Sequence, residues 1–290
     1  MTSLDEKRFI TSAAGVRSPR ILYGTAWKKD RTQALVELAI AHGFRGIDTA
    51  GQPKHYDEAA VGRAVTASLA NGLAREDLYL QTKFTPLAGH DPARVPYDSA
   101  AALDEQVAQS FETSLRNLDT SYVDCLILHS PVPDPRQLAA VWGAMEAIAG
   151  SGCARQLGIS NCYSVEYLEM LCGAATVGPA VVQNRFYAAT GYDSELRRSC
   201  KAQGIVYQSF WTLTANPELL ACEEIAQAAR RHGRTPAQVL FRFLTQEGAV
   251  PLTGTQSEVH MREDLAIFEF SLAADERGAI NALIARSAAG

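Results

Sequence analysis

Long hydrophobic runs are missing from this chain of 290 residues. No stretch reaches the ~20 apolar residues of a transmembrane helix, and the opening segment MTSLDEKRFI lacks the apolar core of a secretory signal peptide. Charged residues are also scarce, at 20%, and they leave a net charge of −5 without any basic run. Nucleic-acid binding and membrane insertion are therefore not expected, and the composition predicts a globular protein of the cytoplasm.

Several compact motifs are absent as well. The six cysteines form no CxxC pair, so they are expected as reduced thiols packed as small apolar groups. The six histidines form neither HxH nor HExxH, so the usual spacing of a metal site is missing. No GxSxG segment is present, and a nucleophilic hydrolase is therefore not expected.

The chain does contain a regular alternation of short apolar segments and amphipathic segments. The apolar segments predict strands at residues 21–25, 46–49, 78–84, 122–128, 154–160, 180–184, 205–210 and 249–252. The amphipathic segments predict helices at residues 32–41, 57–69, 100–118, 137–149, 165–171, 194–202, 217–231, 236–245, 257–266 and 275–285. Strands this apolar have no face suited to water, which is typical of parallel strands covered by helices.

Two α/β architectures satisfy this alternation, an open doubly wound sheet and a closed (β/α)8 TIM barrel. The doubly wound fold favours an early glycine fingerprint, but the nearest candidate, GSG at 150–152, has Arg155 where the third glycine would fall. We therefore expect one barrel domain over residues 1–290. Apolar Phe9–Ile10, followed by the turn-forming pair Ala14-Gly15, predicts a short N-terminal hairpin that closes the barrel floor.

Four polar residues stand at the ends of predicted strands or just beyond them. Asp48 lies in GFRGIDTA, Lys83 in LYLQTKF and His129 in CLILHSP. Tyr56 lies in KHYDEAAVG, after the second strand. The carboxyl ends of barrel strands form the face that carries active sites, and adjacent strands are only ~4.8 Å apart. These four side chains are therefore expected to converge.

The chemistry of the four residues is complementary. A lysine ammonium near Tyr56 favours the phenolate and is expected to lower the pKa of the phenol from its usual value near ~10. Asp48 would hold Lys83 charged through a charge-assisted hydrogen bond, and His129 would orient a carbonyl group or adjust its proton supply. This arrangement predicts Tyr56 as a general acid toward a carbonyl oxygen.

Each of these residues, taken alone, also has an ordinary structural explanation. Asp48 is typical of a helix N-cap and Lys83 of a solvated rim. His129 is typical of a structural hydrogen bond and Tyr56 of amphipathic packing. Two functional alternatives also stand beside carbonyl reduction: a barrel that binds cofactor without catalysis and serves as a regulatory subunit, and a Schiff-base lyase that uses Lys83. The combination of four complementary residues on three neighbouring strands favours carbonyl reduction.

The segments that carry Asp48, Tyr56, Lys83 and His129 resemble those of the aldo-keto reductase superfamily, and the resemblance covers most of the chain. In that family a tetrad of Asp, Tyr, Lys and His has the roles described above. One spacing departs from the commoner family pattern, because the stretch 51–55 places Tyr56 eight residues after Asp48. The resemblance implies an NAD(P)H-dependent oxidoreductase that reduces an aldehyde or ketone to an alcohol.

The resemblance also implies a nicotinamide cofactor, since no side chain supplies a hydride. Ser160, Asn161 and Gln183 match the family's side chains that bind the carboxamide. Phe210 matches the aromatic ring that stacks on the nicotinamide. Further positions matched to the cofactor cradle are Gly24, Thr25, Trp211 and Leu213.

The segment after the last predicted strand matches the family's site for the adenosine end of the cofactor. Gly254 stands where NADPH-using members often carry a lysine, and His260 where they carry an arginine. Thr255 and His260 remain as candidates to hold the 2′-phosphate, while Glu263 and Asp264 match positions that contact adenine. Family habit favours NADPH, and NADH is the alternative.

Aromatic residues predict an apolar mouth above the nicotinamide. Trp27, Phe84 and Tyr97 are expected to line it, and the irregular stretch 85–99 is expected to form part of its wall. The expected partner is a small-molecule carbonyl substrate, either an aldehyde or an activated ketone. The sequence makes no prediction of an oligomeric state.

Overall fold

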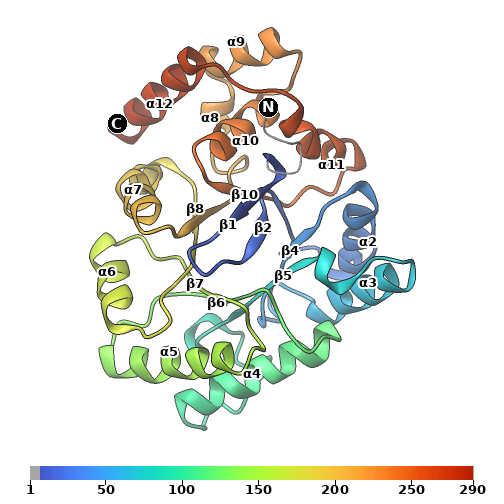
Figure 1. Cartoon of the computed structure of the whole chain (residues 1–290), viewed down its shortest axis with the longest axis vertical. Helices are drawn as coiled ribbons and strands as arrows, with labels where there is room; N and C mark the ends of the chain where they lie inside the picture. The colour runs from blue at the N-terminus through green and yellow to red at the C-terminus, as the bar shows by residue number, and fades with distance from the viewer. Residues whose placement is uncertain (1–6, 290) are drawn as a thin grey trace.

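The architecture is a closed barrel of parallel strands surrounded by helices (Figure 1). It was obtained as a computed structural model, which describes residues 7–289. Around the barrel the strands follow the order β10-β3-β4-β5-β6-β7-β8-β9, and β10 closes the ring by pairing with β3. The predicted (β/α)8 barrel is therefore confirmed.

The barrel strands are short. They are β3 (Leu22–Gly24), β4 (Gly46–Asp48), β5 (Tyr79–Phe84), β6 (Cys125–Leu128), β7 (Leu157–Ser160), β8 (Val181–Arg185), β9 (Val206–Phe210) and β10 (Val250–Thr253). Several begin later than the apolar pattern predicts. Before β6, for example, the chain forms only one isolated bridge, between Val123 and Ala154.

The helices form the outer layer. They are α2 (Thr32–His42), α3 (Glu58–Ala70), α4 (Leu103–Leu118), α5 (Pro135–Gly150), α6 (Val165–Ala174), α7 (Ser194–Ala202), α8 (Pro217–Leu220), α9 (Glu223–His232), α10 (Pro236–Gln246), α11 (Glu258–Leu265) and α12 (Ala274–Ala289). Among residues 7–289, no helix is both long enough and apolar enough to cross a membrane.

One predicted helix, over residues 217–231, is wrong. The structure divides it into α8 and α9, because Cys222 takes an extended conformation with φ −70° and ψ 148°. Glu223 and Glu224 then open α9, where carboxylates favour the N-terminal end of a helix dipole.

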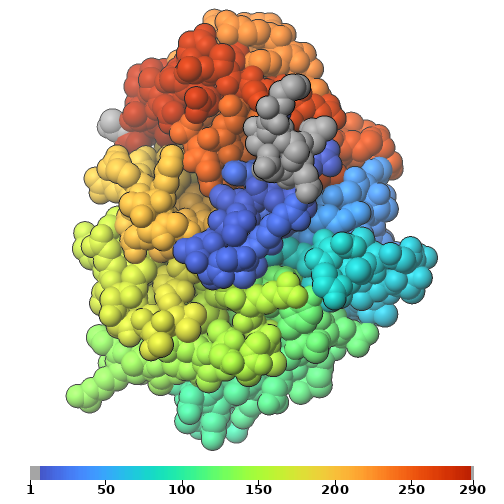
Figure 2. All heavy atoms as spheres, viewed as in Figure 1, coloured from blue at the N-terminus to red at the C-terminus, as the bar shows by residue number. Residues whose placement is uncertain are grey.

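The predicted N-terminal hairpin is present, as antiparallel strands β1 (Phe9–Thr11) and β2 (Arg17–Pro19). It lies across the end of the barrel that faces the viewer in Figures 1 and 2. Ile10 and Val16 pack against the apolar residues inside the barrel. Ser12 donates a hydrogen bond to Gln156 Oε1 at 2.6 Å, so the hairpin closes the barrel floor.

The core has two parts, because side chains alternate along each strand. The larger part lies between barrel and helices, and it buries residues such as Leu80, Val182 and Trp142. The smaller part lies inside the barrel and consists of Leu22, Tyr79, Cys125, Ile127, Val181, Val206, Val250 and Leu252. The six cysteines are free thiols, and three of them are buried.

Candidate functional site

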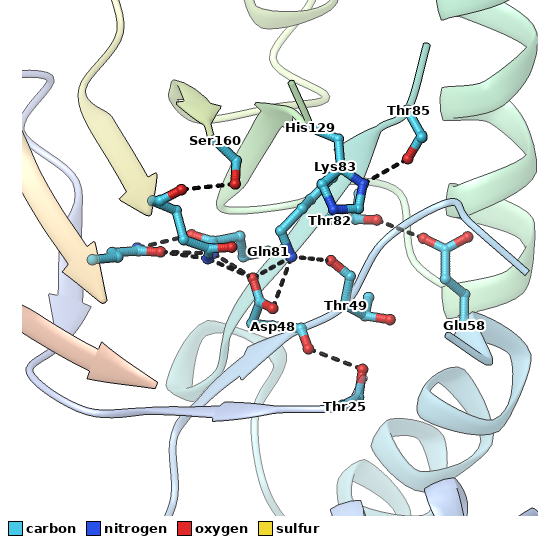
Figure 3. A network of polar contacts seen from close by, with 12 residues as sticks. Thr25, Asp48, Thr49, Glu58, Gln81, Thr82, Lys83, Thr85, His129 and Ser160 are labelled. Carbon is cyan, nitrogen blue, oxygen red and sulfur yellow. Dashed lines mark hydrogen bonds and ion pairs between the residues drawn. The ribbon is translucent and has the colours of Figure 1, made fainter. Parts of the chain in front are cut away.

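A buried ion pair lies at the carboxyl end of the barrel strands (Figure 3). Lys83 Nζ donates to Asp48 Oδ1 at 2.7 Å, to Asp48 Oδ2 at 2.8 Å and to the carbonyl oxygen of Thr49 at 2.8 Å. Lys83 is 1% exposed and Asp48 is 3% exposed, so water does not screen the pair. The structural alternative for Lys83, a solvated residue at the rim of the barrel, is therefore wrong.

A layer of glutamine amides supports the carboxylate from below. Gln81 Nε2 and Gln183 Nε2 donate to Asp48 Oδ1 at 2.6 and 2.9 Å, and both also donate to Gln208 Oε1 at 2.9 Å. Gln208 returns a bond from its own amide to Gln81 Oε1 at 2.9 Å. The carboxylate is therefore held in one orientation by a network whose members are all buried.

The network continues down the barrel axis to the floor. Tyr79 donates to Gln81 Oε1 at 3.1 Å, and Gln156 Nε2 donates to the Tyr79 hydroxyl at 3.0 Å. Ser12 of the hairpin donates to Gln156 Oε1. A single chain of donors thus runs from Ser12 to Asp48, with every donor directed toward the carboxylate.

Tyr56 lies in the loop between β4 and α3. The centroid of its ring is 5.2 Å from Lys83 Nζ and 6.0 Å from the ring centroid of His129, which it meets edge-on. The loop is closed by Gln52, whose carbonyl oxygen accepts from the N–H groups of His55 and Tyr56. The structure therefore brings together the four residues that the sequence predicts to converge.

The start of α3 fixes the position of Tyr56. Glu58 is buried in the first turn and accepts from Thr82 Oγ1 at 2.5 Å and from Ser114 Oγ at 3.1 Å, which ties α3 to β5 and α4. Gly62 allows the close approach, since a Cβ there would lie 2.1 Å from the carbonyl oxygen of Asn117. These contacts fix the start of α3, two residues after Tyr56.

The pKa of Tyr56 differs in direction from the sequence-based expectation. Burial raises it above its usual value, and the Asp48 carboxylate raises it further. The expected lowering by Lys83 is wrong for this structure, because Asp48 lies within hydrogen-bond distance of the same ammonium and offsets its charge. Tyr56 is consequently a protonated phenol at neutral pH.

His129 is held on two sides. Its Nδ1 lies 2.7 Å from Thr85 Oγ1, and its carbonyl oxygen accepts from Asn161 Nδ2 at 2.8 Å. Burial and the positive charge of Lys83 lower the pKa of His129 well below its usual value. The imidazole is therefore neutral at neutral pH and can take part in hydrogen bonds as a dipole.

The residues matched to the carboxamide site already have partners within the protein. Ser160 Oγ donates to the carbonyl oxygen of Gln183 at 2.7 Å, and the Gln183 side chain lies in the amide layer beneath Asp48. Asn161 has the unusual φ of 56° and bridges to His129. Phe210 ends β9 and is partly exposed, beside the barrel interior.

The remaining residues matched to the cradle lie around the same mouth. Thr25 is buried, with its hydroxyl bonded to the carbonyl oxygen of Asp48 at 2.9 Å, and Gly24 pairs with Asp48 in the sheet. Trp211 is 48% exposed, and the Arg185 guanidinium lies 4.2 Å from its ring centroid. Leu213 is half-buried in the turn that follows Trp211.

The turn after β10 has a cationic side chain that the sequence reading overlooks. The buried Lys28, from the loop after β3, donates to the carbonyl oxygen of Gly254. A Cβ on Gly254 would lie 3.4 Å from Lys28 Nζ. Arg31 Nη1 donates to Gln256 Oε1 at 2.7 Å, and the Tyr23 hydroxyl donates to the carbonyl oxygen of Thr255 at 2.9 Å. The two loops therefore form one basic cradle.

The three predicted residues on α11 differ in accessibility. His260 is exposed and Glu263 is half-buried. Asp264 is 4% exposed and accepts from Thr253 Oγ1 at 2.7 Å. Its burial raises the pKa of the carboxyl to about 7. The side chain of Asp264 therefore points into the protein. In this orientation it does not make the expected contact with adenine.

The expected aromatic mouth is only partly present. Trp27 is 53% exposed and stacks on His55 at 3.7 Å between ring centroids. Phe84 and Tyr97 are instead buried against each other in the outer core, and the Tyr97 hydroxyl donates to the carbonyl oxygen of Thr85. Since Lys83 faces the barrel interior, the alternation of the strand directs Phe84 outward.

Sequence reasoning missed Gln81, Gln208, Thr85 and Lys28. The first of these had a usable signal, since period two along β5 places Gln81 on the same face as Lys83. Gln208 likewise shares a face with Phe210 on β9. Thr85 and Lys28 lie in loops, where no periodicity indicates the direction of a side chain.

Comparison with known proteins agrees with this geometry. The model of the Aldo/keto reductase family matches residues 20–217 and 207–285. Glyoxal reductase of Bacillus subtilis is 33% identical over 248 residues, which is 86% of this chain and 82% of that protein. An aldo-keto reductase of Mycobacterium avium is 33% identical over 254 residues, 88% of this chain and 82% of that protein.

A solved structure shares the whole architecture. The crystal structure of an aldo/keto reductase from Brucella melitensis is 26% identical, with a TM-score of 0.80, and the match covers 95% of this chain and 98% of that one. The family model covers most of the sequence, and the structural match covers the barrel and its outer helices. The chain therefore belongs to the aldo/keto reductase family, whose members are oxidoreductases that act on carbonyl compounds.

Proposed function

We propose that this protein reduces a small aldehyde or ketone to an alcohol, with NADPH as its cofactor and Tyr56 as the proton donor. The observation that carries the proposal is the convergence of Tyr56, His129 and the Lys83–Asp48 pair at one end of the barrel. A phenol and a neutral imidazole provide donors to a carbonyl oxygen, and the Lys83–Asp48 pair beside them leaves no buried charge unpaired.

Tyr56 donates its phenolic proton to the carbonyl oxygen as negative charge develops there. The raised pKa of Tyr56 keeps this proton in place, so the donor is loaded before each turnover. Lys83 Nζ lies 5.2 Å from the ring centroid, and its pairing with Asp48 holds the ammonium beside the phenol during the transfer. The same raised pKa opposes the oxidative direction, which would begin from the phenolate.

His129 positions the carbonyl group. Its neutral ring is held through Nδ1 by Thr85. A neutral imidazole adds a hydrogen bond to the reacting group without competing with Tyr56 as an acid. Thr85 is in this way a positioning residue for His129.

The basic side chains beside the turn after β10 support the binding of a nicotinamide dinucleotide at this end of the barrel. When bound, the reduced nicotinamide supplies the hydride. Lys28, Arg31 and the turn after β10 would hold its adenosine phosphate end. NADPH-using members of the family often carry a lysine at the position of Gly254. Because Gly254 has no side chain, the Lys28 ammonium lies beside this position and would take the place of that lysine. This basic cradle favours NADPH over NADH.

The Schiff-base alternative is not favoured by the surroundings of Lys83. An amine that attacks a carbonyl must be neutral, whereas Lys83 Nζ donates to both oxygens of Asp48 and to Thr49. Borohydride trapping with an aldehyde is therefore expected to leave Lys83 unmodified. Recovery of a reduced adduct at this residue would favour the lyase instead.

Replacement of the donor tests the proposal directly. Tyr56→Phe should lower kcat with NADPH and glyoxal by about 10² to 10⁴-fold, while cofactor binding, followed by tryptophan fluorescence, stays near that of the parent protein. Glyoxal is chosen because a related enzyme of Bacillus subtilis is a glyoxal reductase.

Tyr122→Phe is the matched control, since the Tyr122 ring lies between Arg75 and Arg155, away from the site, and its hydroxyl has no hydrogen-bond partner among residues 7–289. It should leave kcat unchanged. Full activity of Tyr56→Phe would refute the assigned donor. Cofactor binding without turnover of any aldehyde by the parent protein would favour the regulatory alternative.

The cofactor preference rests on Lys28. Lys28→Gln should raise the Kd for NADPH by on the order of tenfold and leave the Kd for NADH unchanged, because one charge-assisted hydrogen bond is lost. Lys29→Gln, which removes an exposed charge one residue away, should change neither Kd. Equal weakening of both cofactors by Lys28→Gln would contradict 2′-phosphate recognition by this residue.

A further inference from the structure

A basic pocket lies at the opposite end of the barrel from the ion pair of Asp48 and Lys83. Its volume is about 330 Å³, and it is lined by Lys7, Arg20, Lys201, Arg242, Thr245, Gln246, Glu247 and Gly248. These residues come from the segment before β3, the end of α7 and the last turn of α10. Figure 2 shows the blue hairpin adjoining the orange and gold segments on this face.

Two arginines form the wall of the pocket, and both bind neutral groups. Arg242 is 6% exposed; its Nη2 donates to Ser271 Oγ at 2.9 Å, and its Nη1 to Thr245 Oγ1 at 3.5 Å. Arg20 donates to the carbonyl oxygens of Phe9 and Thr245 at 2.9 and 3.4 Å. Within residues 7–289, neither guanidinium has a carboxylate within ion-pair distance.

One donor on this wall has no partner. The Nε of Arg242 is buried and lacks a hydrogen-bond acceptor within the described part of the chain. Burial lowers the pKa of Arg242, and the positive charge of Arg20 lowers it further, so the two guanidinium groups repel each other. A buried donor without an acceptor, beside a like charge, costs free energy unless an anion supplies the acceptor.

Among residues 7–289, the lining of the pocket has one carboxylate, and it is already paired: Glu247 Oε1 accepts from Arg277 Nη1 at 3.2 Å. Within the same residues, four cationic side chains, those of Lys7, Arg20, Lys201 and Arg242, face this one acidic side chain. The described lining residues include no aromatic ring, so they offer no surface on which a nucleotide base would stack.

We propose that this floor pocket binds a compact multivalent oxyanion of the phosphate class, held by Arg20, Arg242 and Lys201. The planar guanidinium groups match the oxygen atoms of phosphate, and Lys201 adds an exposed ammonium at the rim. The anion would accept from the guanidinium groups of the lining and offset the repulsion between the two arginines. It would also link α7, α10 and the segment that follows the hairpin.

The test is titration with inorganic phosphate, with sodium chloride added to keep the ionic strength constant. Phosphate should raise the Tm of the parent protein along a saturating curve, and calorimetry should give a millimolar or tighter Kd. Arg242→Gln should weaken that Kd by on the order of tenfold, as expected for the loss of a charge-assisted contact. Lys201→Gln, at an exposed position that tolerates substitution, should weaken it less.

Lys28→Gln separates this pocket from the cofactor cradle at the other end of the barrel. It should retain the full response to phosphate. Loss of the response in Lys28→Gln, with retention in Arg242→Gln and Lys201→Gln, would overturn the proposal and assign the anion to the cofactor cradle. An equal rise in Tm with chloride alone would overturn it as well.

Discussion

The two ends of the barrel treat buried positive charge in opposite ways. At the carboxyl end, the Lys83 ammonium is bonded to both oxygens of Asp48, and two glutamine amides hold that carboxylate in place. At the floor, Arg242 is also buried, but its partners are neutral and its charged neighbour is another arginine.

The Lys83 ammonium has a carboxylate as its partner, whereas the two guanidinium groups at the floor have no carboxylate within ion-pair distance among residues 7–289. A compensated ion pair can remain in a closed, rigid site and shape the pKa values around it. An uncompensated pair of cations gains from any anion that fits between them. The buried cations at the two ends of one barrel thus support two different proposals, proton transfer at one end and anion binding at the other.

Breaking the compensated pair should have the largest effect. Asp48→Asn leaves the Lys83 ammonium buried beside a neutral amide, so we expect the free energy of unfolding to fall by about 3–5 kcal/mol. The kcat for glyoxal reduction should fall with it, since the charge that fixes Lys83 beside Tyr56 is lost. Urea unfolding and steady-state kinetics measure the two effects.

The double variant Asp48→Asn with Lys83→Met is the control for this prediction. It removes both charges, so most of the stability should return, while kcat should remain low. Asp48→Asn with the stability of the parent protein would show that the pair is not electrostatically coupled.

A smaller effect is expected at Asp264, which lies on α11 beside the end of β10. Burial raises its pKa to about 7 from an ordinary value of 3.8. A raised pKa in the folded state favours the protonated form, so stability is greatest below the ordinary value and declines as the pH rises through 7. Asp264→Asn should remove this decline. At pH 8 its free energy of unfolding should exceed that of the parent protein by a few kcal/mol, since each unit of pKa shift corresponds to about 1.4 kcal/mol, and it should therefore unfold at a higher denaturant concentration.

The comparison at Asp264 needs measurements at pH 5 and pH 8. The neighbouring Glu263→Gln removes a half-buried carboxylate on the same helix and serves as the matched control. The same loss of stability between pH 5 and pH 8 in the parent protein and in Asp264→Asn would contradict the assignment.

The smallest effect should come from the floor. Arg242→Gln removes one of two repelling charges, so the gain offsets the loss of the bond to Ser271. We expect the free energy of unfolding to change by less than about 1 kcal/mol, in contrast to the loss at Asp48. A loss as large as that of Asp48→Asn would remove the contrast.

The sequence was sufficient to predict the barrel, its hairpin and the convergence of Asp48, Lys83, His129 and Tyr56. Short apolar strands that alternate with amphipathic helices have few architectures in which to bury themselves. The places of Asp48, Lys83 and His129 at the ends of neighbouring strands then predicted that these side chains converge. Period two along β5, had it been applied, would have placed Phe84 on the face opposite Lys83 and removed it from the predicted mouth.

Other features depend on contacts between distant segments. Lys28 and Gly254 are separated by 226 residues and meet because β10 closes the barrel on β3. The direction of the pKa shift of Tyr56 required two facts that the sequence does not contain, namely its burial and the bonding of Asp48 to the same ammonium. The inward orientation of Asp264 likewise follows from its bond to Thr253.

The donor chain along the barrel axis has a consequence for attempts to redesign this protein. Every link from Ser12 through Gln156, Tyr79 and Gln81 points toward Asp48. Reversing the Gln81 amide would turn its oxygen toward Asp48 Oδ1 and Gln208 Oε1, so acceptor would face acceptor and this orientation of the amide is fixed. A graft onto the hairpin that displaces Ser12 would therefore disturb a chain of hydrogen bonds that ends at the Asp48 carboxylate.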